Sequence, residues 1–100
     1  EVASLDGHLL LQLKNKGYDV YGCDPSILSK KAEKKVGYGR IKKSFFNENN
    51  YKKNSFDIII LRNLLEHIYN PKKFLRGINK CLKDNGYLFV EVPNVEFFYP

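Results

Sequence analysis

The 100-residue sequence has no methionine or tryptophan, only two cysteines, and no long apolar run. Its longest apolar run, Ile58–Leu61, is far shorter than the roughly 20 residues that a membrane-spanning helix needs, so such a helix is excluded. The amino end lacks the basic flank and the long apolar stretch of a signal peptide, so we expect none. Because methionine is missing even at position 1 and Glu1–Ser4 resembles the end of a strand, we expect a piece of a longer protein.

The two cysteines give neither a zinc site nor a disulfide framework. Cys23 ends an apolar segment, and Cys81 lies on the apolar side of a predicted helix. We therefore expect two buried free thiols, no metal, and a reducing cytoplasmic location.

The net charge is +6, and most lysines come in pairs. An ordinary solvated surface is the simpler interpretation, and a nucleic-acid-binding face is the alternative. Neither an aromatic and basic ribbon nor a recognition-helix pattern accompanies the charge. The sequence therefore favours a partner that is neither nucleic acid nor membrane, and it leaves the oligomeric state open.

The order of predicted elements alternates between strands and helices, which is typical of an α/β fold with a parallel sheet. Apolar spacing predicts helices over 7–16 and 26–35, and a third that starts at Asn70–Pro71. Strands are predicted over 18–23, 40–46, 56–61 and 87–92, with a turn at Asn85–Gly86.

Two burial predictions follow from these patterns. Apart from Asp57, all residues of the segment Phe56–Leu61 are apolar, with no alternation of apolar and polar positions. Such a continuous apolar run predicts a strand that is buried on both faces. The second helix is predicted to turn Ile27, Leu28, Ala32 and Val36 toward the core.

Ligands of open parallel sheets bind at the carboxyl ends of the strands. The turn before Gly7 would offer backbone N–H groups there, and Asp24 would offer a carboxylate to a ribose diol. The alternative is a structural turn with a helix cap. Because Gly7 is the only glycine of this turn, the G-x-G-x-x-G pattern is absent, which disfavours NAD and FAD.

Several segments resemble the class I S-adenosylmethionine-dependent methyltransferases. Residues 1–7 resemble the first motif, an acid and an aliphatic residue before a glycine-rich turn, and residues 21–26 resemble the second strand with its ribose-binding acid. Further similar segments follow in the family's order: 56–61, 64–68 with Asn70–Pro71, 82–88, and 91–94.

This resemblance implies a Rossmann-like, mostly parallel sheet with helices on both faces. Residues 1–100 would be a partial methyltransferase domain that lacks the start of strand one and the C-terminal strands. The cofactor would be S-adenosyl-L-methionine, and the acceptor a small molecule such as a sugar or another polysaccharide or natural-product precursor.

The resemblance also implies cofactor-binding residues. Glu1 would orient the first loop, and Asp24 would bind both ribose hydroxyls. The backbone around the methionine part would come from Ala3, Ser4, Leu5 and Gly7. The adenine would contact Pro25, Ser26, Ser44, Phe45 and Phe46, although either phenylalanine could belong to the core instead. The fourth strand would line the cofactor through Leu61, Arg62 and Asn63.

Ala3 and Leu5 stand where the family usually has glycine. A leucine there would crowd the methionine part, and it would be strained if its φ were positive. A decayed methyltransferase fold that serves as an interaction domain is therefore an alternative function. A nucleic-acid methyltransferase is another, although Arg62–Leu65 replaces an Asn-Pro-Pro-Tyr motif.

The candidate proton acceptor is His67, because its ordinary pKa lies near neutral pH. Glu66 beside it would orient the ring. A packing role for this pair is the alternative. The reaction implied is direct displacement, in which the enzyme mainly positions the acceptor and excludes water.

Overall fold

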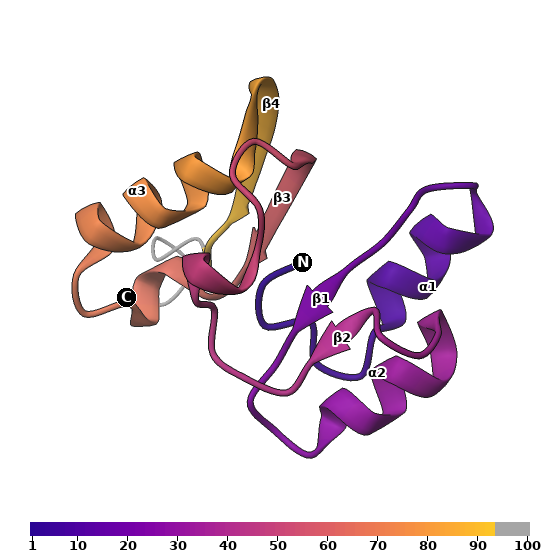
Figure 1. The fold of residues 1–100 in the computed structure, drawn as a ribbon. Coiled ribbons are helices and arrows are strands. Elements are labelled where there is room, and N and C mark those ends of the chain that lie inside the picture. Colours follow the sequence, from indigo (N-terminus) through magenta and orange to yellow (C-terminus); the bar gives the residue numbers. More distant parts are fainter. Residues whose placement is uncertain (94–100) are drawn as a thin grey trace. The chain divides into compact units, whose positions relative to one another are not determined.

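The computed structural model describes residues 1–93. By its internal contacts the chain divides into two compact units, residues 1–52 and residues 53–100. The first unit runs from indigo to magenta in Figure 1, and the second from magenta to yellow. Each unit has its own parallel pair of strands and is described by itself.

In the first unit, β1 is the central strand and has a parallel partner on each side. Cys23 in β1 bridges Val2 on one side, and Gly22–Cys23 pairs with Ile41–Lys42 on the other, in parallel both times. β1 therefore lies between the segment at Val2 and β2. The helices and strands of this unit are α1 (His8–Asn15), β1 (Gly22–Cys23), α2 (Leu28–Val36), β2 (Ile41–Lys42) and the 3₁₀ helix η1 (Glu48–Asn50).

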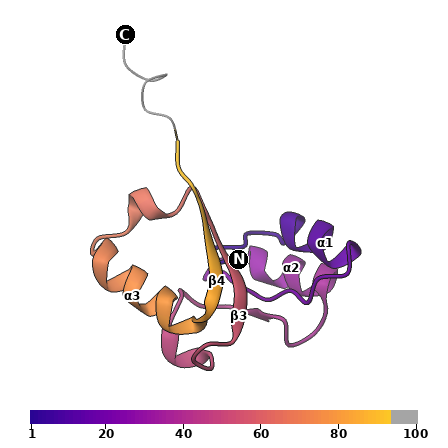
Figure 2. The same cartoon turned by 90° about the horizontal axis from the view of Figure 1, so that it is seen from above.

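The core of this unit takes residues from both helices and from the strand side. Figures 1 and 2 both show α1 and α2 side by side. Lys14 of α1 donates a 2.9 Å hydrogen bond to the carbonyl oxygen of Val36 at the end of α2, which ties the two helices together. The buried apolar cluster consists of Leu10, Val20, Ala32, Val36 and Ile41.

The second predicted helix is confirmed, but one of its predicted core residues is wrong. Ala32 and Val36 are buried, whereas Ile27 is 73% exposed. α2 begins only at Leu28, so Ile27 precedes the helix and does not share its buried face. The predicted strands over 18–23 and 40–46 shrink to two residues each, because only Gly22–Cys23 and Ile41–Lys42 pair.

Within residues 53–93 the second unit contains one parallel pair of long strands and one α-helix. β3 pairs with β4 from Ile58↔Tyr87 to Arg62↔Glu91. The predicted helix start is confirmed, since the Asn70 side chain accepts a 3.2 Å hydrogen bond from the Lys73 N–H. The elements are β3 (Phe56–Arg62), the 3₁₀ helix η2 (Leu65–His67), α3 (Pro71–Cys81) and β4 (Leu82–Glu91).

The prediction that 56–61 is buried on both faces is wrong within the described residues. Ile59 and Leu61 are buried, but Ile58, which precedes Ile59, is 51% exposed. Among the described residues of this unit, α3 is the one α-helix that packs beside β4 (Figure 2), and its buried residues are Gly77, Ile78 and Cys81. A continuous apolar run shows that a strand is hydrophobic, but it does not show how many of the strand's faces are covered by helices.

The predicted turn at Asn85–Gly86 falls inside a bulge of β4. Phe56 pairs with Leu82 and Ile58 with Tyr87, so residues 83–86 stand opposite Asp57 alone. A Cβ on Gly86 would lie 3.1 Å from the Asp57 carbonyl oxygen, which favours glycine at this close approach.

Parallel strands that alternate with helices confirm the predicted α/β class. Cys23 and Cys81 are both buried, as expected, and neither forms a disulfide within the described residues. None of the helices within residues 1–93 has the length and apolar character needed to cross a lipid bilayer.

Candidate cofactor-binding site

A tight bend joins the segment at Val2 to α1. The Ser4 N–H donates to the Cys23 carbonyl oxygen at 3.0 Å, and the Gly7 N–H donates back to the Ser4 carbonyl oxygen at 3.0 Å. Three residues of this bend have left-handed φ angles: Ala3 (58°), Leu5 (53°) and Gly7 (80°). The bend therefore has the backbone shape of a glycine-rich turn, although two of these positions carry side chains.

Gly7 is required at the end of this bend for two reasons. Its φ of 80° favours glycine, and a Cβ would lie 2.9 Å from both the Cα and the Cβ of Ala32. The start of α1 therefore approaches α2 more closely than any side chain allows. Gly22 has a similar packing role, since its Cβ would lie 2.7 Å from the Leu10 Cδ1 and the Ser4 Oγ.

The carboxylate that follows β1 contacts this bend directly. Asp24 Oδ2 accepts a 2.9 Å hydrogen bond from the Leu5 N–H, and Oδ1 accepts a 2.8 Å bond from the Ser26 N–H. Asp24 is only 3% exposed. An ionised carboxylate offers about four acceptor positions, so these two contacts and a hydrogen bond from the Ser26 side chain leave capacity for about one further donor.

Competing influences set the ionisation of Asp24. Burial raises the pKa of this carboxyl, but hydrogen bonds from the Ser26 side chain, the Ser26 N–H and the Leu5 N–H outweigh it. The pKa of Asp24 is therefore lowered below its ordinary value, and the group is ionised at neutral pH.

The helix-cap alternative for Asp24 fits the local contacts poorly. The N–H of Leu28, the first residue of α2, donates to the Ser26 hydroxyl at 3.2 Å. Asp24 accepts from Ser26, which precedes the helix. Ser26 therefore supports the helix start, and the Asp24 carboxylate joins two loops. Pro25 and Ser26 themselves are exposed.

A second carboxylate fastens the bend to α2. Asp6 Oδ2 forms a 3.0 Å ion pair with Lys35, and Oδ1 accepts a 3.3 Å hydrogen bond from the His8 N–H. The hydrogen bond from Lys35 is the main reason that the pKa of Asp6 is lowered. This ion pair was not predicted, because nothing in the sequence links position 6 to position 35.

The segment after β2 carries the predicted adenine contacts. Phe45 is 79% exposed, and Phe46 is half-buried. The Phe46 ring stacks on Tyr51, with 5.9 Å between ring centroids and 10° between the planes. Tyr51 was missed, because it lies inside a polar loop without periodicity. The Ser44 Oγ is buried and finds no hydrogen-bond partner within residues 1–93.

Cys23 of β1 contacts this region through the Tyr51 side chain. Burial raises the pKa of its thiol, and hydrogen bonds from the Ala3 backbone and the Tyr51 side chain offset part of that rise. The thiol is therefore protonated at neutral pH.

The second unit carries the remaining predicted residues. Leu61 is fully buried, so it can contribute only backbone to a ligand. Asn63 has a φ of 53°, and its N–H donates to the Glu91 carbonyl oxygen at 2.7 Å. Arg62 is half-buried and precedes this turn.

Glu66 and His67 are both exposed on η2. In the part of the chain that the structure describes, no hydrogen bond or ion pair joins their side chains. The His67 N–H donates to the Leu64 carbonyl oxygen at 2.9 Å, which fixes the backbone and leaves the ring accessible.

The structure thus brings together Ala3, Ser4, Leu5, Gly7, Asp24 and Ser26 in the first unit. Glu1 belongs to the same unit, and its carbonyl oxygen accepts a 3.3 Å hydrogen bond from the Cys23 N–H. Asn94, the last residue of the 91–94 segment, lies outside the described residues. The cofactor roles of all these residues stay predictions.

Comparison with known proteins now adds to this geometry. Residues 1–100 match the family described as "Methyltransferase domain". The chain belongs to that family. No functionally curated protein matches the sequence of this methyltransferase domain.

Among solved structures, the methyltransferase domain is similar to a crystal structure described as a SAM-dependent methyltransferase from Aquifex aeolicus. The TM-score is 0.70 at 24% sequence identity, and the match covers 89% of this chain. It covers 52% of the Aquifex chain, so this chain spans about half the length of that protein. The likeness shows the fold, a partial Rossmann-like α/β domain, as predicted.

Proposed function

We propose that this protein transfers a methyl group from S-adenosyl-L-methionine to a small-molecule acceptor. The observation that carries the proposal is the Asp24 carboxylate, which is ionised, buried and hydrogen-bonded to the Leu5 N–H of the bend. Membership of the methyltransferase family and the likeness to the SAM-dependent enzyme from Aquifex support the cofactor.

The residues of the first unit fit an adenosine group on two grounds. Asp24 is an ionised carboxylate after β1, the kind of group that binds ribose hydroxyls, and it keeps about one acceptor position after the hydrogen bonds from the Leu5 N–H, the Ser26 N–H and the Ser26 side chain. The buried Ser44 Oγ lacks a partner within the described residues, and a ring nitrogen or amine of adenine would supply one.

Each part of the chain then has a defined task. Asp24 binds the ribose hydroxyls, the backbone of Ala3–Gly7 surrounds the methionine part, and the segment at Ser44–Phe46 contacts the adenine. The cofactor supplies an electrophilic methyl group on a sulfonium centre. The protein orients the acceptor and excludes water.

His67 is the proposed proton acceptor for an acceptor hydroxyl. Its side chain is exposed on η2, which is what a group that meets an incoming substrate requires. Glu66 adjoins it in sequence and would orient the ring once substrate is bound. A sugar or another polyol precursor would be a suitable acceptor, because its hydroxyl groups need such a base.

Calorimetric titration of the full-length protein with S-adenosylhomocysteine tests the proposal. The parent protein should bind, and Asp24→Asn should weaken binding by about tenfold or more, which is about 1.4 kcal/mol. Asp84→Asn is the control, because Asp84 is exposed. Absence of binding at about 1 mM ligand, a free energy near −4 kcal/mol, would contradict the proposal.

A decayed fold that serves as an interaction domain is the second candidate. It is favoured by the leucine at position 5, whose side chain is 54% exposed at a φ that favours glycine. It requires that the parent does not bind S-adenosylhomocysteine and that Leu5→Gly does. A cytoplasmic location remains a further proposal, which rests on the two buried free thiols.

A further inference from the structure

Positive charge concentrates on α2 and the segment around β2. Between residues 30 and 43 the chain has seven basic residues and one acidic residue, Glu33. Lys35 pairs with Asp6, Arg40 with Asp19, and the Lys42 ammonium lies 5.9 Å from the Tyr51 ring centroid. The other four make no ion pair within residues 1–93: Lys30, Lys31, Lys34 and Lys43.

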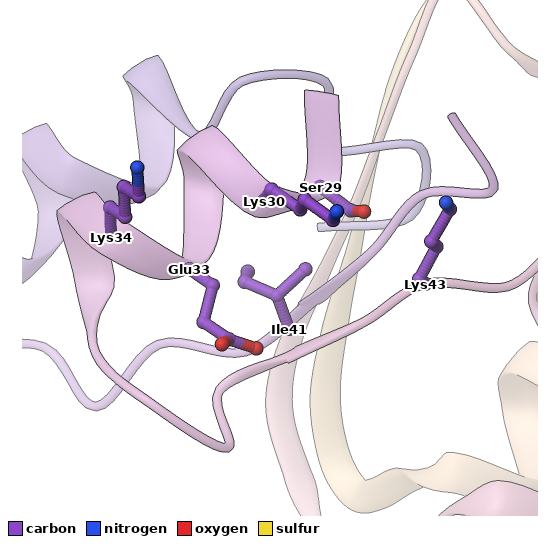
Figure 3. A pocket seen from close by; sticks show the side chains of 6 residues that line it. All are labelled: Ser29, Lys30, Glu33, Lys34, Ile41 and Lys43. Carbon is purple, nitrogen blue, oxygen red and sulfur yellow. The ribbon is translucent and has the colours of Figure 1, made fainter. Parts of the chain in front are cut away.

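Three of these unpaired lysines line a pocket of about 430 Å³ between α2 and β2. This volume lies in the range of roughly 300–1,000 Å³ typical of small-molecule sites. All of the lining belongs to the first unit (Figure 3): Ser29, Lys30, Glu33, Lys34, Ile41 and Lys43.

The two ends of the pocket differ in charge. In Figure 3 the ammonium groups of Lys30 and Lys43 lie toward the Ser29 end, and the Glu33 carboxylate points the opposite way. The Ile41 side chain lies between them, and the ammonium of Lys34 points away from it. The pocket therefore has a cationic end, an apolar middle and an anionic end.

The cationic end is suited to a phosphate. Lysine ammonium groups bind phosphate as point charges, and here two of them come from separate segments, α2 and the residue after β2. The Ser29 hydroxyl donates to the Ser26 carbonyl oxygen at 2.9 Å, so its lone pairs remain available to a ligand hydroxyl.

The anionic end limits which phosphate compound fits. A nucleic-acid backbone carries a charge at every nucleotide and would bring phosphates against Glu33. A small molecule with one phosphate and several hydroxyls would instead donate hydrogen bonds to the Glu33 carboxylate. The charge pattern thus favours a small ligand over a polyanion.

We propose that this pocket binds a small phosphorylated polyol, with the phosphate between Lys30 and Lys43 and a hydroxyl on Glu33. The site lies outside the residues proposed for the adenosine group, so it does not depend on the proposed methyl transfer.

Titration of the full-length protein with ribose 5-phosphate, inorganic phosphate and ribose tests the site, with calorimetry or amide chemical shifts as the readout. Ribose 5-phosphate should bind about fivefold or more tightly than inorganic phosphate, and ribose should bind weakest. Lys30→Ala/Lys43→Ala should weaken ribose 5-phosphate by about tenfold or more, whereas the charge-matched control Lys31→Ala/Lys53→Ala should not.

Glu33→Gln separates the small ligand from a polyanion. It should reduce the preference for ribose 5-phosphate over inorganic phosphate toward one, because the hydroxyl partner becomes neutral. A surface for nucleic acid predicts the reverse, since loss of Glu33 would tighten binding of a single-stranded oligonucleotide. The substituted lysines are exposed and Glu33 is only half-buried, so melting temperatures should change little in the variants.

Three results would overturn the proposal. One is unchanged ribose 5-phosphate affinity in Lys30→Ala/Lys43→Ala. Another is an oligonucleotide that binds more tightly than ribose 5-phosphate with the same lysine dependence. The third is displacement of ribose 5-phosphate by S-adenosylhomocysteine, which would assign the pocket to the cofactor.

Discussion

The Leu5 N–H donates a 2.9 Å hydrogen bond to Oδ2 of Asp24, which follows it by nineteen residues in the sequence. This bond joins the bend before α1 to the loop after β1. It also means that the backbone shape of the bend and the ionisation of Asp24 depend on each other. Two of the predictions below test this dependence.

Acid should destabilise the fold partly through Asp24. Its pKa is lowered in the folded protein, so its contribution is fully present above the unfolded value near 3.8 and is lost as the pH falls through the folded value. Urea unfolding between pH 7 and pH 3 should show this loss below about pH 4. Asp24→Asn should lower stability at pH 7 by about 1–3 kcal/mol and flatten the acid dependence. An acid dependence equal to that of the parent would contradict the assignment.

Leu5→Gly should relieve the strain of a leucine at a φ of 53°. A non-glycine residue in the left-handed region costs about 1–2 kcal/mol, which the substitution would remove. Glycine makes the unfolded chain more flexible, and this entropy lowers the stability of the variant by about 0.5–1 kcal/mol. We therefore expect a change in unfolding free energy within about 1 kcal/mol, measured by urea denaturation. Affinity for S-adenosylhomocysteine should rise, because Asp24 is nearly covered and a more flexible bend opens it. Weaker binding in the variant would show that Leu5 itself helps to hold the cofactor.

Gly7→Ala and Gly17→Ala form a matched pair. Both positions have positive φ, 80° and 95°, but an added Cβ collides with Ala32 only at Gly7. Gly17→Ala should cost about 1 kcal/mol from backbone strain, and Gly7→Ala should cost about 1–3 kcal/mol more from overpacking. Equal losses in denaturant unfolding would mean that α1 and α2 adjust without cost.

His67→Gln should separate binding from proton transfer. If His67 accepts the proton, the methyl-transfer rate should fall by about 10²–10⁴-fold while affinity for S-adenosylhomocysteine stays the same. The pH dependence of the rate should also change, because the group that accepts the proton is gone. His8→Gln is the control, because His8 is exposed on α1. A variant that keeps the parent's pH profile would leave His67 with a packing role.

Local signals in the sequence predicted the parts of the fold that depend on neighbouring residues. Asn70–Pro71 marks the start of α3 because the cap and the proline act within one turn. The alternation of elements sufficed for the α/β class. In contrast, Ile27 and Ile58 are exposed because burial depends on where a helix begins and on which faces neighbours cover.

The site shows the same division. Asp24 and the bend were each predicted, but their direct contact depends on how the two loops meet in space. The packing role of Gly22 could not be predicted, because an added Cβ would collide with Ser4 and Leu10, which are distant in sequence. Lys35 and Tyr51 were missed for the same reason.

The pairing of β2 affects how copies of this protein meet at high concentration. Within the described residues β2 pairs only with β1, so its other edge has no strand partner there. Lys42 and Lys43 place two like charges at that edge, where a second molecule would bring two more. Such repulsion discourages intermolecular sheet growth, so the lysines at this border also protect the protein from aggregation.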